Sequence, residues 1–180
     1  MGYTDINKDE VDLNFSWVVG DMLAGCRIPL NTSEIKYLKE QGVDVLVRLV
    51  ETHLTGIPRS LLLENGVEEY NEPIIDFSAP SQEQFISILR FLSNCFVDGK
   101  RVAVACRQGR GRTGTILAAA LIMNGLTAEE AITEVRKRRS PSIEPGEQED
   151  AIRVFASELE LDNAPTQILH QEWPVGLLKD

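Results

Sequence analysis

Short aliphatic runs alternate along the chain with longer segments whose apolar residues recur every three or four positions. Such runs are typical of buried strands, and the longer spacing is typical of helices with one apolar face. Capping boxes are predicted at Ser81 with Gln84 and at Thr127 with Glu130. The pattern predicts strands at 15–19, 43–50, 67–75 and 102–105, and helices at 31–42, 58–64, 81–98, 115–123, 127–139 and 145–161.

This alternation predicts a single α/β domain, in which a central, mainly parallel (mixed) sheet is flanked by helices on both faces. A chain of 180 residues is long enough for one substantial core. We assign residues 1–161 to this domain and residues 162–180 to a C-terminal tail. The tail lacks helical periodicity, but apolar residues such as Trp173 indicate that it packs back on the domain or binds a partner.

Composition narrows the class of protein and its partners. Hydrophobic residues make up 43% of the chain and charged residues 26%, as in an ordinary globular domain. The formal net charge of −10 argues against nucleic-acid binding and against a basic membrane-binding face. No apolar run is long enough for a membrane span or a signal peptide. We expect no nucleic-acid partner and no stable membrane insertion; a monomer is favoured, with the oligomeric state open.

The cysteines and histidines indicate the compartment and the absence of a metal. Cys26, Cys95 and Cys106 are sparse and odd in number, which predicts reduced thiols and a cytoplasmic, or also nuclear, location. His53 and His170 have no ligand partner at the spacing of a metal site. We therefore expect no metal and no other cofactor.

The segment 102–123 joins a predicted strand to a predicted helix through a loop that contains Gly109 and Gly111. Backbone N–H groups converge in such a loop, and the helix N-terminus adds about half a positive charge, so the loop is suited to bind an anion. Cys106 starts the loop and Arg112 follows six residues later. This environment lowers the pKa of a thiol from about 8.5 to roughly 3.5–7.5, which favours a nucleophilic thiolate.

One loop thus offers both a nucleophile and an oxyanion site. We expect Cys106 to attack phosphorus in line, Arg112 to hold two phosphate oxygens, and Thr113 to donate its hydroxyl to the departing thiolate in a second step. The alternative for Cys106 is a buried thiol that only packs as a small apolar side chain. The residues expected to bind the phosphate are Arg107, Gln108, Gly109, Arg110, Gly111 and Arg112.

The sequence from Cys106 to Gly114, Cys-Arg-Gln-Gly-Arg-Gly-Arg-Thr-Gly, resembles the Cys-x5-Arg signature of the protein tyrosine phosphatase superfamily. It is most similar to the small atypical dual-specificity phosphatases, and the resemblance extends from about residue 15 to residue 148. The resemblance implies the dual-specificity-phosphatase fold and hydrolysis through a cysteinyl phosphate. Ala105 stands where this family usually carries a His that helps to lower the thiol pKa.

Two further residues complete the predicted mechanism. Asp76 follows a predicted strand in a loop closed by Pro80, and the resemblance implies that the general acid lies in such a loop, some thirty residues before the cysteine. The alternative is an Asp that stabilises a turn. Gln148 resembles a Gln at the start of the last helix of related phosphatases and is expected to position water. Glu144 and Glu147 are alternatives, as is a purely structural role for Gln148.

Two groups of basic residues stand out against the acidic background. Arg107 and Arg110 occupy loop positions where phosphoinositide phosphatases that resemble the tensin homologue carry Lys, which suits a multiply phosphorylated ligand or a phosphopeptide with flanking acids. The second group, at 136–139, ends a predicted helix. Its cations either add to a positive field around the loop or are solvated residues favoured at a helix C-terminus.

The substrate is the most open part of the prediction. No extended phosphotyrosine-recognition segment precedes the loop, so we expect a shallow pocket that admits phosphotyrosine, phosphoserine and phosphothreonine. A protein phosphatase is ranked first, and a phosphatase of phosphoinositides or other small phosphate esters second. A rhodanese-like sulfurtransferase and a phosphate-binding module without turnover are the less favoured alternatives.

Overall fold

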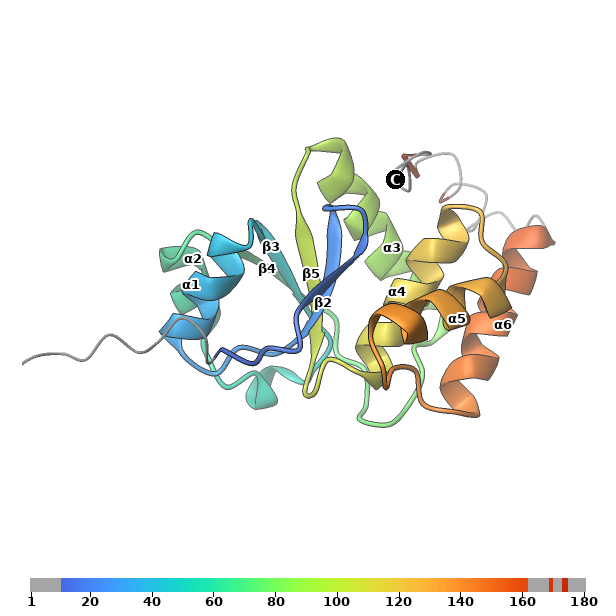
Figure 1. Ribbon diagram of the computed structural model, residues 1–180, viewed down its shortest axis with the longest axis horizontal. Coiled ribbons are helices and arrows are strands. Elements are labelled where there is room, and N and C mark those ends of the chain that lie inside the picture. Colours follow the sequence, from blue (N-terminus) through green and yellow to red (C-terminus); the bar gives the residue numbers. More distant parts are fainter. Residues whose placement is uncertain (1–10, 162–168, 170–172, 175–180) are drawn as a thin grey trace, which may run out of the picture.

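The computed structural model describes residues 11–161, 169, 173 and 174, and its centre is a five-stranded sheet (Figure 1). The strands lie in the order β1-β2-β5-β3-β4. β1 pairs antiparallel with β2 and the other neighbouring pairs are parallel, so the predicted mixed, mainly parallel sheet is confirmed. The strands are β1 (Ser16–Val19), β2 (Leu23–Arg27), β3 (Val45–Arg48), β4 (Glu68–Asn71) and β5 (Val102–Cys106).

Helices flank the sheet on both sides. Figure 1 shows α1 and α2 on one side and α3 to α6 on the other. α4 packs against β5 and β2 and also contacts α3, α5 and α6, so it is the central helix of its layer. The helices are α1 (Thr32–Glu40), α2 (Arg59–Glu64), α3 (Gln82–Val97), α4 (Gly111–Met123), α5 (Ala128–Arg138) and α6 (Glu147–Glu160), with a short 3₁₀ helix η2 (Thr52–Leu54).

β5 and α4 form the buried axis of the domain. Every residue of β5 is buried, and so is every residue of α4 from Arg112 to Met123. β5 lies between β2 and β3 and is covered on both faces, which explains its continuous run of small aliphatic residues. The loop that joins these two elements therefore starts and ends inside the core.

The capping boxes are confirmed, but some predicted limits are wrong. Ser81 Oγ accepts a bond from Gln84 N at 3.3 Å, and Thr127 Oγ1 accepts one from Glu130 N at 3.3 Å. α4 begins at Gly111 and not at residue 115, because its first turn is small and polar and lacks the apolar spacing that reveals a helix. The strand predicted at 67–75 ends at Asn71, and the chain leaves this sheet edge before Pro73.

β2 is a strand that the apolar pattern does not predict. It contains Gly25, which weakens any strand signal in the sequence. The structure explains the glycine: a Cβ at this position would lie 2.8 Å from Leu117 Cδ1 and 2.9 Å from Arg139 Cζ. The strand thus carries a glycine so that α4 and the residue that follows α5 can approach its backbone.

Three residues of the predicted C-terminal tail are described, and two of these are buried. They are Leu169 and Trp173, and the ring of Trp173 meets Phe96 of α3 edge to face, with centroids 5.6 Å apart. Apart from Pro174, the other tail positions lie outside the described residues. In the part of the chain that the structure describes, no helix combines the length and apolar character needed to cross a bilayer.

Candidate active site

The predicted phosphate loop connects the last residue of β5, Cys106, to the first residue of α4, Gly111. Backbone bonds fix its start, because Ile28 N donates to Cys106 O at 3.0 Å and Leu49 N donates to Ala105 O at 2.8 Å. These bonds attach the end of β5 to the residues that follow β2 and β3. Cys106 therefore lies at the carboxyl end of the central strand, where parallel sheets bind ligands.

Gly109 lets the loop pass close to β2. Its φ is +68°, and a Cβ there would lie 2.3 Å from a backbone carbon of that strand. The loop carbonyls are bound from outside: Asn14 Nδ2 donates to Gln108 O at 3.3 Å, and Arg139 Nη2 donates to Gly109 O at 2.7 Å. In a trans peptide the N–H points opposite to the C=O, so the N–H groups of Gly109 and Arg110 are turned away from these donors. This orientation suits anion binding on the inner side of the loop.

Arg112 lies in the first turn of α4 and reaches Asp76 from the core. Its side chain is only 3% exposed, and Nη2 donates to Asp76 Oδ1 at 2.7 Å. Nη1 donates to Ile74 O at 2.7 Å and to Leu49 O at 3.4 Å. Because these carbonyls hold one edge of the guanidinium, its orientation is set before any ligand binds.

A cavity of about 110 Å³ lies between these groups. Four predicted catalytic residues from different parts of the chain line it: Cys106, Arg112, Asp76 and Gln148. Arg107, Gln108, Arg110 and Gly111 line it as well. Gly109 shapes the loop without lining the cavity. The structure thus brings the predicted nucleophile, phosphate-binding cation and acid to one place, while their catalytic roles stay predictions.

The segment 75–79, which carries Asp76, is held over the loop by a small number of polar contacts. Asp76 Oδ1 also accepts a bond from Phe77 N at 3.1 Å, so the side chain stabilises a local turn as well as facing Arg112. Ala79 N donates to Glu147 Oε1 at 3.2 Å, which attaches the segment to α6. The Asp76 side chain is 42% exposed, and Phe77, with φ at +63°, is 76% exposed.

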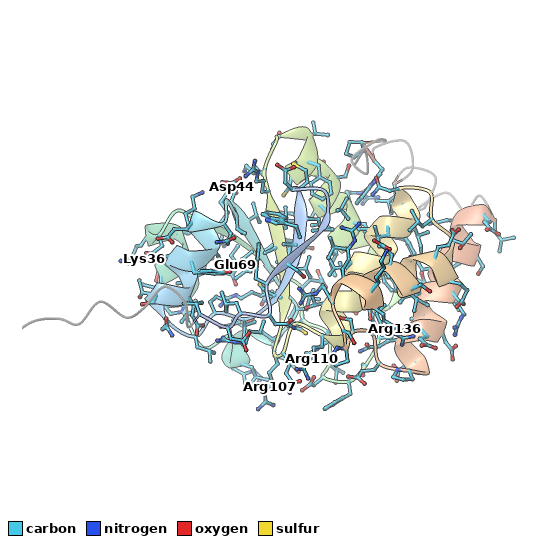
Figure 2. All side chains as sticks on the ribbon, viewed as in Figure 1. Lys36, Asp44, Glu69, Arg107, Arg110 and Arg136 are labelled. Carbon is cyan, nitrogen blue, oxygen red and sulfur yellow. The ribbon has the colours of Figure 1, made fainter. Side chains whose placement is uncertain are left out.

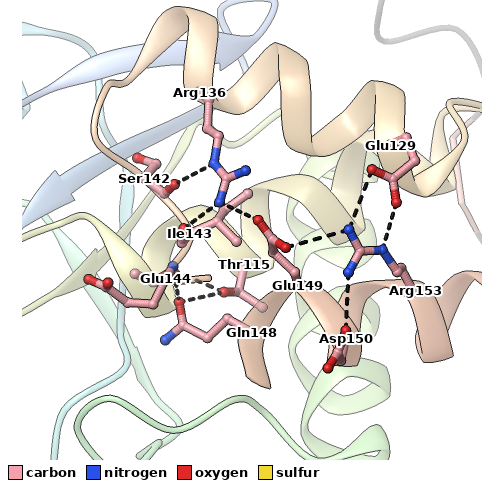
Figure 3. Close-up of polar contacts among 11 residues, drawn as sticks. Thr115, Glu129, Arg136, Ser142, Ile143, Glu144, Gln148, Glu149, Asp150 and Arg153 are labelled. Carbon is pink, nitrogen blue, oxygen red and sulfur yellow. Dashed lines mark hydrogen bonds and ion pairs between the residues drawn. The ribbon is translucent and has the colours of Figure 1, made fainter. Parts of the chain in front are cut away.

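Gln148 is buried and links three parts of the site; Figure 3 shows its bonds to Thr115 and Glu144. Its Oε1 accepts bonds from Thr115 Oγ1 at 3.3 Å and from Glu144 N at 2.9 Å. Its Nε2 donates to Ser78 O at 3.1 Å. The amide therefore ties α4 to the segment that carries Asp76. These bonds confirm the alternative prediction that Gln148 has a structural role. The second N–H of its amide remains available to a water molecule.

Thr113 is fully buried, and its hydroxyl has no hydrogen-bond partner among the described residues. Buried hydroxyls are usually paired, so an unpaired one is available to a partner that forms during a reaction. This fits the predicted donation to the departing thiolate, which stays a prediction.

Arg139 is a site residue that the sequence does not reveal. The predicted interpretation of the cations at 136–139 as solvated residues is wrong for it, because it is buried and donates from Nη1 to Ser16 Oγ at 2.6 Å and to Gly25 O at 2.7 Å. With its bond to Gly109 O, the guanidinium links β1, β2 and the phosphate loop. Burial lowers the pKa of Arg139, while negative charge on Cys26 and Cys106 opposes this, so its charge is coupled to both thiols.

Arg136 is also bonded within the fold. It donates to Ser142 O at 3.1 Å and Ile143 O at 2.8 Å, and it pairs with Glu149 at 2.6 Å (Figure 3). These contacts hold the segment that precedes α6 and, through Glu149, α6 itself, the helix that carries Gln148.

Arg107 and Arg110 are exposed and lie at the lower end of the molecule in Figure 2, apart from Arg136. Neither has a hydrogen bond or ion pair with another described residue. Both line the cavity, so their charge is available to a ligand.

The cysteines are free thiols, and Cys26 differs from Cys106 in its surroundings. Burial raises the pKa of Cys26 to about 12, so it carries a proton at neutral pH. Within the described residues, no group of three or more His, Cys, Asp or Glu side chains is arranged to hold a metal ion.

The sheet, the covering helices and the Cys-x5-Arg loop together define a member of the protein tyrosine phosphatase superfamily. The model of the family described as "Polymorphic toxin system, DSP-PTPase phosphatase" matches residues 22–126, more than half of the chain. The chain belongs to this family of cysteine-dependent phosphatases, which confirms the resemblance noted in the sequence.

Three known proteins illustrate the relationship. The crystal structure of Tk-PTP in its active form is 32% identical, covers 80% of this chain and 97% of its own, and superimposes with a TM-score of 0.74. Mouse protein tyrosine phosphatase domain-containing protein 1 is 28% identical over 78% of this chain. The phosphatidylglycerophosphate phosphatase PTPMT1 of Arabidopsis thaliana is 29% identical over 75% of this chain. The chain spans 21% of the mouse protein and 41% of the Arabidopsis protein.

Proposed function

We propose that this protein hydrolyses phosphomonoesters of proteins, both phosphotyrosine and phosphoserine or phosphothreonine, through a cysteinyl phosphate on Cys106. One observation carries the proposal: Cys106, Arg112 and Asp76 line a single cavity, with Arg112 Nη2 2.7 Å from Asp76 Oδ1. Phosphoryl transfer from an ester requires a nucleophile, an oriented cation and a proton donor around one binding cavity, and these three residues supply them.

In the first step the Cys106 thiolate attacks phosphorus, and the P–O bond to the leaving group breaks. The substrate phosphate takes over the Arg112 guanidinium, whose Nη2 is paired with Asp76 before binding. Asp76, released from this pair, acts as the general acid. Asp76 then gives its proton to the leaving oxygen.

In the second step water attacks the cysteinyl phosphate, and the P–S bond breaks. The free N–H of Gln148 Nε2 orients the water, and Asp76 accepts its proton. The Thr113 hydroxyl, buried and without a partner among the described residues, donates to the departing thiolate. Inorganic phosphate leaves and the enzyme returns to its starting state.

The rim of the cavity supports a protein substrate of mixed specificity. Phe77 is 76% exposed beside Asp76, so it offers an aromatic surface to a substrate side chain without enclosing it deeply. Exposed Arg107 and Arg110 supply positive charge around the phosphate. A shallow rim of this kind admits short phosphoserine as well as long phosphotyrosine.

A second candidate is a phosphatase of phosphoinositides or other small phosphate esters. Ile75 and Phe77 are both more than 70% exposed next to the cations of the cavity, a combination that also suits a lipid headgroup at an interface. The similarity to a phosphatidylglycerophosphate phosphatase adds support. The formal net charge of −10 weakens this candidate, because an acidic protein is repelled by anionic membranes.

The test is phosphate release, with a chelator present, from three matched sets: phosphopeptides, soluble inositol phosphates and phosphoinositides in vesicles. The proposal predicts the highest kcat/KM for phosphopeptides, with both phosphotyrosine and phosphoserine hydrolysed. If the vesicle lipids are hydrolysed and the phosphopeptides are not, the second candidate function replaces the proposed one. No release from any ester would reject the phosphatase function altogether.

The family description adds a biological role to the proposal, namely that of a toxin domain. On this view, expression of the active chain slows the growth of a sensitive host, and the Cys106→Ser variant at equal expression does not. Equal growth of hosts that express the active chain and the Cys106→Ser variant would show that the phosphatase activity is not toxic to that host.

A further inference from the structure

A second cavity, of about 490 Å³, adjoins the cavity that contains Cys106. The two share four lining residues: Asp76, Arg107, Gln108 and Arg112. The remaining wall comes from the segments that follow β2 and β3. A substrate whose phosphate lies over Cys106 therefore has room beside it in this second cavity.

Part of this wall is apolar and open to solvent. Ile28 and Val50 are buried at its base, whereas Leu30 and Leu54 are 57% and 52% exposed. Large aliphatic side chains with this exposure gain from being covered by an apolar part of a ligand. The wall thus offers contact to the stem of a long side chain.

Glu51 places an unpaired negative group in the same wall. Its Oε2 is buried and has no hydrogen-bond partner among the described residues. Two nearby cations are engaged elsewhere: Arg27 forms two bonds to Glu34, at 3.0 and 2.8 Å, and Arg112 is paired with Asp76. A buried carboxylate oxygen without a donor is unfavourable, so a ligand that brings an N–H donor on an apolar stem complements this carboxylate once its side chain turns toward the cavity.

We propose that the second cavity binds a lysine or arginine side chain of the protein substrate, located within a few residues of the phosphorylated residue. The aliphatic stem covers Leu30 and Leu54, and the charged head reaches Glu51. This inference rests on the proposed phosphatase function and adds the substrate class. Arg107, at the border of the two cavities, does not oppose the basic side chain, because the substrate phosphate neutralises it.

The same observations disfavour an acidic ligand in this cavity. A second phosphate or a carboxylate would meet the unpaired Glu51 within a protein of formal net charge −10. A flat anionic membrane would meet the same repulsion.

The experiment measures kcat/KM for phosphotyrosine peptides of an alanine-based sequence in which one position, from three before to three after the phosphotyrosine, carries lysine, norleucine or glutamate. Norleucine keeps the apolar stem and removes the charge. For the wild-type protein we expect lysine to exceed norleucine about tenfold at one position and glutamate to be the poorest. The lysine-to-norleucine ratio is then compared among variants, because it does not depend on their overall activity.

Glu51→Gln, nearly isosteric, should bring that ratio close to one. Glu51→Lys should reverse the order of the lysine and glutamate peptides. Glu64→Gln, an exposed carboxylate of α2, is the matched control and should keep the wild-type ratio. The subsite is established if the lysine-to-norleucine ratio falls to about one in the Glu51 variant and keeps its wild-type value in the Glu64 variant.

A ratio near one at every position in the wild-type protein, or a ratio that survives in Glu51→Gln, would overturn the inference. So would faster hydrolysis of phosphoinositide vesicles than of every peptide. Hydrolysis of 4-nitrophenyl phosphate by the wild-type protein separates these failures from failure of the phosphatase function itself, because that substrate has no group that reaches Glu51.

Discussion

The phosphate loop between β5 and α4 is enclosed by buried elements, whereas segment 75–79, which meets it in the same cavity, is exposed and held by a few polar contacts. Arg139 and Asn14 bind the loop carbonyls from outside, and Gly109 fits against β2 with no space for a side chain. Asp76, by contrast, is 42% exposed, and its side chain contacts Arg112 and the neighbouring Phe77 N.

This difference matches the two tasks that we propose for the site. A nucleophile and an anion cradle act best when their geometry is set before the substrate arrives, since no reorganisation is then needed. A proton donor must exchange partners during the cycle, and an exposed, lightly attached segment allows that exchange. The variants below separate the two parts, from the largest expected effect to the smallest.

Cys106→Ser removes the nucleophile from the enclosed part. Turnover of an aryl phosphate should fall by a factor on the order of 10⁴ or more, because serine at this position is a far weaker nucleophile. Steady-state phosphate release measures the loss. Cys95→Ser, in α3 and outside the cavity, is the control and should retain wild-type turnover. Substantial hydrolysis by Cys106→Ser would show that another group attacks phosphorus.

Asp76→Asn removes the acid from the exposed part. The first step should slow about 10²- to 10³-fold for esters with poor leaving groups and little for those with good ones, because only poor leaving groups need a proton. A series of aryl phosphates of increasing phenol pKa measures this dependence. Glu147→Gln is the control, because it weakens the bond that Ala79 N donates to residue 147 but retains Asp76. Any decrease in rate in this variant should be the same for all leaving groups. Equal slowing of all esters by Asp76→Asn would exclude it as the acid.

Arg139→Met tests how much the buried guanidinium that binds Gly109 O contributes to the stability of the loop and the domain. Removal of the guanidinium leaves Ser16 Oγ and two carbonyls without their donor, so the free energy of unfolding should fall by about 3 kcal/mol. Urea unfolding measures it, and Arg138→Met, at an exposed position that pairs with Glu134, should change it by less than about 0.5 kcal/mol.

The same Arg139 variants also report on charge. Arg139→Met should move iodoacetate inactivation to higher pH, whereas Arg139→Lys, which keeps a cation, should retain more of the wild-type profile. An unchanged profile in Arg139→Met would limit this residue to a structural role.

Ala105→His gives the smallest expected effect and restores the residue that related phosphatases carry. A protonated imidazole beside the thiolate stabilises it, so iodoacetate should inactivate the variant at lower pH than the wild type. Ala105→Asn, polar and uncharged, is the control. Cys26 does not interfere, since its raised pKa of about 12 keeps it protonated over the range studied. Identical profiles in all three proteins would mean that the loop and Arg139 alone set the reactivity.

The features that the sequence predicts are those whose causes lie close together along the chain. Cys106 and Arg112 are read from one loop, and the capping boxes from residues three apart, so local chemistry is sufficient. β2 escapes prediction because its Gly25 is explained only by Leu117 and Arg139, which approach it from distant segments.

The features that the sequence does not predict depend on contacts between segments that are distant along the chain. The role of Arg139 depends on Ser16, Gly25 and Gly109, and nothing in the basic run at 136–139 distinguishes it from its exposed neighbours at 137 and 138. Likewise Gln148 is recognised by resemblance, but its bond to Ser78 O, which links it to the acid segment, follows only from the fold. Tertiary contacts, not local propensity, assemble the exposed part of the site.

We propose above that phosphate passes through a covalent bond to Cys106 during turnover. The most direct measurement is an acid quench during turnover of a phosphotyrosine peptide, followed by mass spectrometry of the proteolytic fragments. We expect a phosphoryl group on the Cys106 sulfur in the wild-type protein, none on Cys26 or Cys95, and none in Cys106→Ser. Rapid product release with unmodified Cys106, or a phosphoryl group on another residue, would contradict it.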